Sequence, residues 1–421
     1  MLDVLKTSWA LLLGMLLLMV GNGLQGTLLG VRGDIEGFST LQMSIVMSAY
    51  FAGFFGGSRL TPELIRRVGH VRVFAALGSF ISAALILFPV ITEPYAWVAL
   101  RVVIGFCFSG VYVTAESWLN NAATNENRGK TLSLYMIVQM AGIVSAQGFL
   151  FFGDPSGFIL FIIPSVLVSI SFAPILLSVN PTPAFEAAKP MGLRELYKVS
   201  PLGCVGIFLL GGVFAAQFGM ASVYATKTGM TIGQISVFIA MLYVGALFLQ
   251  YPIGWVSDRM DRRLLSCAVA AFGGVAALIG VIFGESYTVL LGVAFVVGGM
   301  SSPLYSLLLA YTNDFLDPED MPGASGGLIF INGMGAIAGP LITGWMMGQV
   351  GPRGFWLFIA LLMIALAGYA AYRMTQRASV PVEDSGAYVG VLQSASPVAL
   401  EAAQEWAIEA SEDDNSPATG T

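Results

Sequence analysis

Charged residues are scarce in this chain. Lysine, arginine, aspartate and glutamate make up 10% of its 421 residues, whereas 56% are hydrophobic and the mean hydropathy is +0.80. So few polar side chains cannot cover the surface of a soluble globule of this length. The composition therefore excludes a soluble protein and predicts an integral membrane protein.

Histidine and cysteine are nearly absent. His70 is the only histidine, which excludes a multi-histidine metal site and a histidine proton relay. Cys107, Cys204 and Cys267 are dispersed, so they predict neither a disulfide framework nor a metal site. No phosphate-cradling G-x-x-x-x-G-K-[ST] motif and no convergent catalytic set is visible. We expect no metal, no cofactor, no nucleic-acid partner and no enzymatic activity.

Long apolar runs are abundant. A bilayer core of about 30 Å needs roughly 20 apolar residues in a helix. Twelve such runs occur, near 8–30, 43–61, 71–92, 96–119, 130–152, 157–178, 201–226, 232–256, 263–284, 287–311, 325–349 and 354–374. They predict an all-α membrane protein with twelve transmembrane helices.

The basic residues are distributed unevenly between the two sides. With a cytoplasmic amino terminus, the inner segments hold most of the lysines and arginines, and the outer loops keep only Arg32, Lys227 and Arg353. Because basic residues accumulate in inner loops, both termini are predicted to be cytoplasmic.

The polar segments divide the chain into four parts. We expect a six-helix bundle over 1–178, a cytoplasmic linker over 179–200, a second bundle over 201–374, and a tail over 375–421. The tail is acidic, which is typical of disorder, although ALEAAQEWAIEA also fits a short helix.

Unusual residues recur at a nearly constant offset. The offset is 192 for Gln25 and Gln217, and 193 for both Tyr50 with Tyr243 and Gln139 with Asn332. Arg67 with Arg259 and Gly129 with Gly323 follow the same spacing. The pattern predicts two six-helix repeats of parallel orientation.

The segment GWVSDRMDRRL, from Gly254 to Leu264, resembles the loop signature of the major facilitator superfamily. More narrowly, SAYFAGFFGG, LRVVIGFCFSGVYVTAESWLNN and NRGKTLSLYMIVQMAG resemble the YcaD-type branch of that superfamily. The signature residues are Gly254, Asp258, Arg259, Arg262 and Arg263, with Asp261 where the family usually has glycine. In the first half, Pro62 and Arg66 stand where Gly254 and Asp258 do.

The resemblance implies that helix two lies beside helix eleven and helix five beside helix eight. The basic first-half loop, with Arg66 and Arg67, would then face Asp317, Glu319 and Asp320 across the seam and act as a conformational gate. Asp258 would bind a helix amino terminus, Arg128 or Lys130. The alternative is that these charges only set topology and remain solvated.

Two ionisable residues lie within the apolar runs. Arg101 and Glu116 share one face of helix four with Gly105, Phe108 and Tyr112, about 22 Å apart along the axis. Ionisable groups at membrane depth are candidates for function, and here for coupling to protons. Alternatively, Arg101 reaches the outer headgroups and Glu116 is satisfied by loop amides.

Several polar and aromatic residues lie on the helices that surround the cavity in this superfamily. Each could instead bridge neighbouring helices. The candidate solute contacts are Asn22, Gln25, Phe108, Tyr112, Gln139, Gln217, Tyr305 and Asn332, with Gln25 and Gln217 preferred.

Together these features predict a monomeric, multi-pass secondary transporter of the inner membrane that moves a small organic solute by alternating access. Few charges and several amides favour a neutral or planar molecule such as a riboflavin-like vitamin. Uptake is favoured over drug or metabolite efflux, because helix five has Gln147 where drug antiporters usually have a glycine-proline pair. A membrane sensor on the same scaffold is the alternative from another class.

Overall fold

A computed structural model of the chain describes residues 2–122, 128–177, 191–378, 380–381, 386 and 388–415. The first half consists of α1 (Leu2–Ile35), α2 (Thr40–Val68), α3 (His70–Leu87), α4 (Pro94–Ala122), α5 (Arg128–Phe149), η2 (Leu150–Phe152), α6 (Ile159–Ser171) and α7 (Ala173–Leu177). The described residues form helices and connecting segments only.

The second half begins after a short helix, α8 (Leu193–Val199). It consists of α9 (Pro201–Ala215), η3 (Ala216–Met220), α10 (Ala221–Lys227), α11 (Ile232–Ser257), α12 (Arg262–Ile282), α13 (Tyr287–Asn313), α14 (Met321–Val350) and α15 (Gly354–Met374). A last helix, α16 (Pro397–Asn415), lies in the tail. The segment η3 is one turn of π-helix, which joins α9 and α10 into a single rod.

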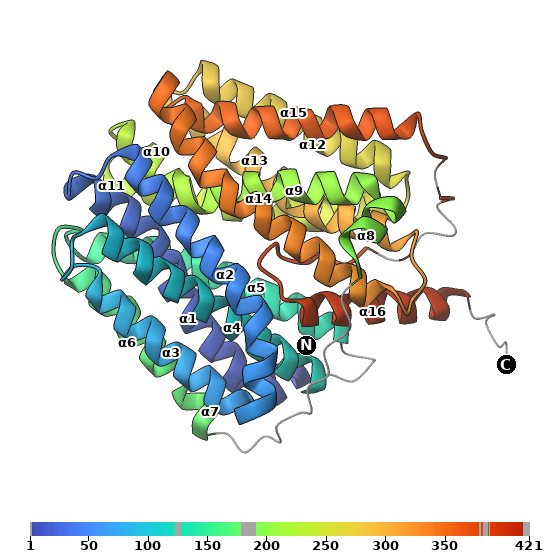
Figure 1. Cartoon of the computed structure of the whole chain (residues 1–421), viewed down its shortest axis with the longest axis horizontal. Coiled ribbons are helices and arrows are strands. Elements are labelled where there is room, and N and C mark those ends of the chain that lie inside the picture. Colours follow the sequence, from blue (N-terminus) through green and yellow to red (C-terminus); the bar gives the residue numbers. More distant parts are fainter. Residues whose placement is uncertain are drawn as a thin grey trace.

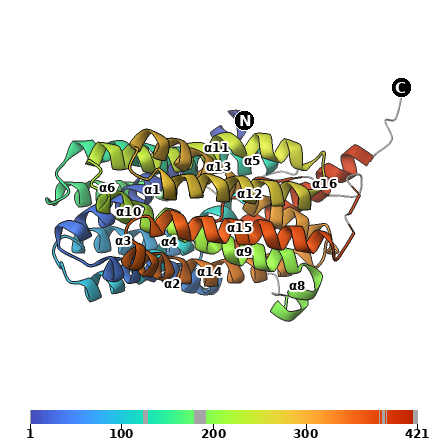
Figure 2. The ribbon, with the colours of Figure 1, turned by 90° about the horizontal axis from the view of Figure 1, so that it is seen from above.

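The helices form two bundles that lie side by side (Figures 1 and 2). In Figure 1 the helices of the first bundle are inclined to α9, α12 and α15 of the second. Among the described helices, eleven segments are long and apolar enough to cross a membrane. The remaining long helix, α2, has 29 residues and packs within the same bundle as α4. This arrangement confirms the prediction of twelve membrane helices.

The two halves repeat the same packing. In the first half α2 packs on α4, α1 on α5, and α3 on both α4 and α6. The equivalent pairs in the second half are α11 with α13, α9 with α14, and α12 with both α13 and α15. The structure therefore confirms two six-helix repeats.

Helix starts are also repeated. Ser39 begins α2 with a capping box, in which its hydroxyl accepts from the Gln42 backbone and the Gln42 side chain accepts from the Ser39 backbone. Thr231 and Gln234 form the same capping box at the start of α11. Each box satisfies backbone N–H groups that a helix start leaves free.

Glycine allows the closest helix crossings. A Cβ at Gly105 on α4 would overlap the backbone carbonyl of Tyr50 on α2. A Cβ at Gly298 on α13 would overlap the carbonyl of Leu242 on α11 in the same way. Because lipid gives no hydrophobic driving force between helices, such close approach provides much of their association energy.

The halves meet at the end of the bundle opposite the tail, which we name the far end. There the Lys227 ammonium lies 2.5 Å from Asp34, and the Ser222 hydroxyl donates to the Gly26 carbonyl at 3.4 Å. Helix α2 packs on α14 and α5 packs on α11, the two neighbour pairs that the family resemblance implies. These contacts close the far end.

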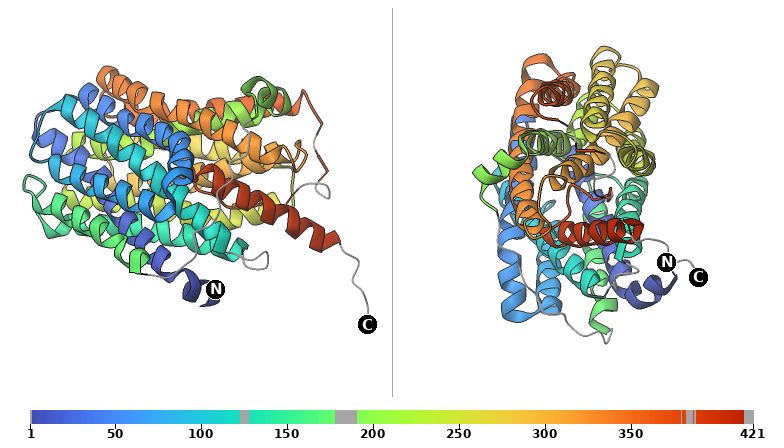
Figure 3. Two further views of the ribbon diagram at one scale, coloured as in Figure 1. Left: turned by 60° about the horizontal axis from the view of Figure 1, so that its bottom comes forward. Right: turned by 90° about the vertical axis from the view of Figure 1, so that its right-hand side faces the viewer.

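The tail differs from its prediction. Sequence composition indicated disorder, yet residues 388–396 enter the space between the halves and α16 packs on α4, α5 and α14 (Figure 3). Leu400 and Ala402 have no exposed surface. The physical reason is that VGVLQSASPVALEAA has side chains that are mostly apolar and small enough to be buried, and all acidic residues of the tail except Glu401 lie outside it. Residues 179–190 of the predicted linker and tail residues 379, 382–385, 387 and 416–421 lie outside the described residues.

Candidate transport cavity

A cavity of about 110 Å³ lies between the two halves. Among the described lining residues, Arg101 is the one charged side chain. The predicted contacts that line the cavity are Asn22, Gln25, Tyr112, Gln217 and Asn332. The structure thus brings polar residues from both repeats to one enclosed space.

Arg101 anchors the polar wall of the first half. It is 3% exposed, and its Nη1 donates to Gln25 Oε1 at 2.9 Å. Gln25 in turn donates to Asn22, and Asn22 donates to the Tyr112 hydroxyl, each at 3.2 Å. The guanidinium also lies 4.5 Å from the centre of the Tyr50 ring. Arg101 therefore faces the cavity rather than the outer surface of the bundle.

Gln217 occupies the matching wall of the second half. It lies in the π-helical turn η3, and its amide exchanges hydrogen bonds of 3.1 Å with the Ser301 hydroxyl on α13. A π-helical turn widens the helix by one residue and often marks a functional site. Gln25 and Gln217 thus line the same cavity from equivalent positions, although each is held by different partners.

Aromatic rings connect the two walls. Phe214 lies with its ring centre 4.1 Å from Phe218 and 6.3 Å from Phe51 of the other half. Phe218 meets Tyr243 at 5.0 Å, and Phe51 meets Tyr50 at 5.4 Å. This surface could contact a planar ring by stacking or edge-to-face packing.

Other predicted contacts do not line the cavity. Phe108 and Tyr305 have no exposed surface, and Gln139 is 2% exposed on α5. The Tyr305 hydroxyl has no hydrogen-bond partner among the described atoms. Helical spacing alone does not separate a cavity-facing residue from one that packs between helices, which is why these three predictions fail as direct lining.

Glu116 lies outside the cavity lining, on the tail side of Tyr112. Its carboxylate accepts the Tyr135 hydroxyl at 3.1 Å and the backbone N–H of Ser396 at 2.8 Å. The residue is 3% exposed. Glu116 and Arg101 have separate partners, in agreement with the prediction that they form no direct ion pair. The backbone amide that bonds Glu116 comes from the tail and not from a neighbouring loop.

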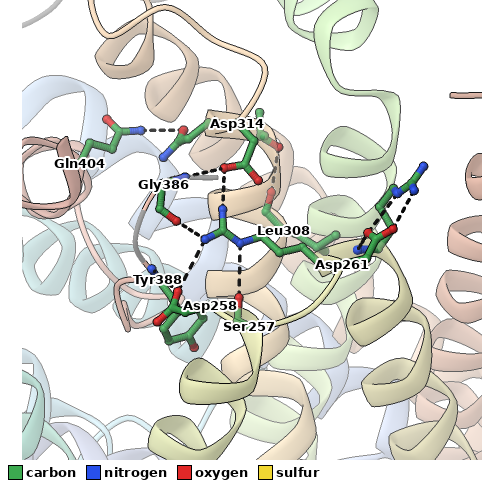
Figure 4. A network of polar contacts seen from close by, with 12 residues as sticks. Ser257, Asp258, Asp261, Leu308, Asp314, Gly386, Tyr388 and Gln404 are labelled. Carbon is green, nitrogen blue, oxygen red and sulfur yellow. Dashed lines mark hydrogen bonds and ion pairs between the residues drawn. The ribbon is translucent and has the colours of Figure 1, made fainter. Parts of the chain in front are cut away.

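The signature loop between α11 and α12 is ordered by buried charges (Figure 4). Arg262 Nη1 lies 2.5 Å from Asp314 at the end of α13, and the two side chains are 4% and 5% exposed. Burial raises the pKa of Asp314 above its ordinary value, and Arg262 opposes that rise. Arg263 pairs with Asp261 at 2.7 Å, and Arg259 lies over the Trp255 ring at 4.1 Å.

Asp258 has a different partner from the predicted ones. Its carboxylate accepts the backbone N–H of Tyr388 at 2.9 Å (Figure 4). Gly254 leaves room for the Tyr388 ring, since a Cβ there would lie 2.5 Å from ring carbon Cδ1. The tail thus takes the place expected for Lys130 or a helix amino terminus; the Arg128 side chain lies outside the described residues.

The predicted gate is not formed in this conformation. Arg66 and Arg67 both pair with Glu63 of their own helix, at 2.5 and 2.7 Å. Asp317, Glu319 and Asp320 are exposed, and no ion pair joins them to Arg66 or Arg67 in the part of the chain described here. The pairing with Glu63 is favoured by the helical spacings of three and four residues.

Tail residues complete the cavity, which the sequence analysis did not anticipate. Leu392, Gln393, Ser394 and Ala395 line it together with the membrane helices. The available signal was the low charge of residues 388–400 within an otherwise acidic tail. It indicated burial but not the place of burial.

Comparisons with known proteins agree with this architecture. The sequence model described as "Major Facilitator Superfamily" matches residues 11–220 and 202–402. An uncharacterised MFS-type transporter, YcaD of Escherichia fergusonii, is 25% identical over 83% of this chain and 91% of its own length.

Solved structures share the fold. A point mutant of the nucleoside transporter NupG has a TM-score of 0.74 at 16% identity, covering 87% of this chain and 99% of its own. A bacterial homologue of the human lysosomal transporter Spinster, inward-facing and unoccupied, has a TM-score of 0.66 at 14% identity, covering 95% and 97%. With both repeats matched, this multi-pass membrane protein belongs to the major facilitator superfamily.

Proposed function

We propose that the protein is a secondary active transporter that moves a small organic solute through the cavity between its halves by alternating access. The observation that carries the proposal is the joint lining of one cavity by Arg101 and Gln25 of the first repeat and Gln217 of the second. In alternating access, one repeat rocks against the other about a central site, and equivalent helices of the two repeats surround that site.

The solute is a planar molecule with hydrogen-bonding groups, neutral or weakly anionic, and a vitamin such as riboflavin is the example to test first. The aromatic rings of Phe214, Phe218 and Tyr243 offer it apolar contact. Gln25, Gln217 and Arg101 offer donors and acceptors. The nucleoside transporter that shares the fold has a solute of comparable chemistry, which supports including nucleosides in the same test.

The tail end is the cytoplasmic end of a monomer in the inner membrane of a bacterium. The asymmetry of lysine and arginine supports this orientation. When the tail end closes, Arg66 and Arg67 approach Asp317, Glu319 and Asp320 and act as the gate. The present arrangement, closed at the far end, is then the inward-facing one.

Proton coupling involves Glu116 and Arg101. A carboxylate at membrane depth can carry a proton, and the proton gradient provides about 2.3 kcal/mol per charge for each 100 mV of potential. Glu116→Gln should abolish pH-driven uptake in proteoliposomes. Unchanged uptake would remove Glu116 from the coupling mechanism.

Uptake is favoured over efflux, because α5 has Gln147 at the place where drug antiporters usually have a glycine-proline pair. The amide oxygen of Gln147 accepts a hydrogen bond from the Thr27 hydroxyl at 3.0 Å. An efflux antiporter is the alternative, and a sensor that binds without flux is the alternative from another class. Reconstitution distinguishes them, because only a transporter moves solute across the vesicle membrane and only an exporter moves it outward against a gradient.

The first experiment is thermal unfolding of the detergent-purified protein with riboflavin, nucleosides, sugars, amino acids, organic acids and cationic drugs. Selective binding to the folded state stabilises it by about 2.7 kcal/mol at one hundred times the dissociation constant. Arg101→Gln is the test variant and Arg353→Gln, at the exposed Glu285 pair, is the control. A melting shift that persists in Arg101→Gln would place the binding elsewhere.

A further inference from the structure

The described part of the tail lies as a strap across the tail end of the molecule. Seen from that end, its dark red segment lies between the first half and the second half (Figure 3, right). The buried positions include Leu392, Ala395, Ala399, Leu400 and Ala403, each 8% exposed or less. Burial of this degree is typical of a protein core and not of a solvated tail.

The strap is fixed first on the signature loop. Arg262 donates to the Gly386 carbonyl as well as pairing with Asp314, and the Gly386 N–H donates to Asp314 at 3.2 Å (Figure 4). Asp258 accepts the Tyr388 N–H, and the Gln250 amide donates to the Tyr388 hydroxyl at 2.9 Å. Residues of the loop signature therefore hold the tail backbone.

The next segment fills the inner part of the cavity. The Val391 N–H donates to the Ser306 hydroxyl at 3.0 Å, and the Gln393 amide donates to the Ser301 carbonyl at 3.1 Å. Ser301 is also the partner of Gln217, so this segment of the strap lies directly against the polar wall of the cavity. The remaining cavity, about 110 Å³, is smaller than the roughly 300–1,000 Å³ of most small-molecule sites.

The strap then crosses to the first half. Ser396 donates its N–H to Glu116 on α4, and α16 continues over α5 and α14. The Gln404 amide donates to the Ser325 hydroxyl at 2.7 Å and to Asn313 at 3.0 Å. Trp406 packs directly on Gly129, where a Cβ would collide with its ring. The strap is thereby bonded to both halves.

We propose that Gly386 and residues 388–406 are a docked plug, bound in the tail-end opening of the solute cavity and released before the halves can close there. The inference rests on the proposed function, because it names the regulation of the same site. Alternating access brings the two halves together at each end in turn, and the docked plug occupies the seam that must close. Release of the plug also removes the Ser396 N–H from Glu116, so plug release and the hydrogen bonding of Glu116 are linked.

Hydrogen exchange tests the docked state in the full chain. In the purified protein, amides of residues 388–396 should exchange far more slowly than free peptide amides, as the bonds to Asp258, Ser306 and Glu116 require. Ser396→Pro removes the N–H that Glu116 accepts, whereas Ser396→Ala keeps that N–H and loses the hydroxyl, which also bonds Glu116 and accepts the Val398 N–H. Loss of a charged hydrogen bond should raise exchange of this segment about tenfold in Ser396→Pro.

Cysteine labelling gives a second readout that needs no solute. Ser302→Cys, in a chain with its three native cysteines replaced, lines the cavity and should react slowly with a bulky maleimide. Ser396→Pro should accelerate that reaction, Ser396→Ala should do so much less, and added peptide 386–406 should slow it again. Glu285→Cys, at an exposed position outside the gate and the cavity, is the control whose rate stays constant.

The outcomes separate the two proposals. Free-peptide exchange of residues 388–396 in the wild type, or equal Ser302→Cys labelling in all variants, overturns the plug even if solute flux is found. Protection and labelling as expected support the plug even if no solute is transported, in which case the transport proposal fails alone.

Discussion

The carboxylate of Glu116 on α4 accepts the backbone N–H of Ser396 at 2.8 Å, which joins a membrane helix of the first half to the tail. A buried carboxylate needs hydrogen-bond donors, and here the Tyr135 hydroxyl is the second one. Glu116→Gln weakens both bonds because the acceptor loses its charge. We expect exchange of residues 388–396 to rise about tenfold. Glu285→Gln, an exposed carboxylate outside the gate, is the control and should leave the exchange unchanged.

The Arg262–Asp314 ion pair predicts a strong effect on stability. Asp314→Asn leaves the buried Arg262 guanidinium with only the more distant carboxylate of Asp258, 3.7 Å away. Loss of one partner of a buried pair costs about 3–5 kcal/mol. The midpoint of denaturant unfolding should fall accordingly. Arg353→Gln at the exposed pair with Glu285 should have little effect, since solvent screens it. Equal small effects of both changes would show that the Arg262 pair is solvated.

Helix crossing at glycine gives a paired prediction. Gly105→Ala places a methyl group against the Tyr50 carbonyl and should destabilise the protein by about 1–3 kcal/mol. Gly292→Ala, on α13 with open space around it, should be neutral or stabilising by up to about 1 kcal/mol, since alanine favours helix. Thermal unfolding measures both. A stable Gly105→Ala would contradict the close crossing of α2 and α4.

Solute recognition predicts an unequal effect of two glutamines. Gln217→Ala removes a cavity-lining amide and should weaken binding of a solute found by the melting screen about tenfold, the effect of one lost hydrogen bond. Gln139→Ala, buried on α5 outside the cavity lining, should change affinity little. Isothermal titration measures both dissociation constants. Equal losses would indicate that Gln217 acts through packing and not by contact.

The proposed gate predicts a change in labelling. Reversing Asp317, Glu319 and Asp320 to lysine should disfavour closure at the tail end, because Arg66 and Arg67 would then face like charges. Ser302→Cys in a Ser396→Pro background should label faster with the reversed charges than without them. Unchanged labelling would leave these acids with a topological role only.

The fold could be predicted almost entirely from the sequence. The apolar runs predict the membrane spans, and the basic residues predict their orientation. The nearly constant offset between Gln25 and Gln217, and between Tyr50 and Tyr243, predicts the two repeats. The cavity was predictable in part, because Asn22, Gln25, Tyr112, Gln217 and Asn332 do line it. Phe108, Gln139 and Tyr305 do not, since helical spacing gives a face but not the neighbour on that face.

The tail could not be predicted for a different reason. Its contacts join residues far apart in sequence, such as Glu116 with Ser396 and Asp258 with Tyr388, and they use backbone groups that leave no pattern of side chains. The acidic composition of the whole tail concealed the apolar strap within it. The bond between Asp258 and the Tyr388 backbone was not among the predicted ones for the same reason.

The most direct test of the account is a distance across the tail end. Spin labels on Val68→Cys and Pro318→Cys, exposed positions on the two halves beside the proposed gate, report its opening by double electron–electron resonance in liposomes. We predict one long distance in the plugged wild type and an additional shorter distance in Ser396→Pro, as the freed halves close. The same single distance in both proteins would contradict alternating access controlled by the tail.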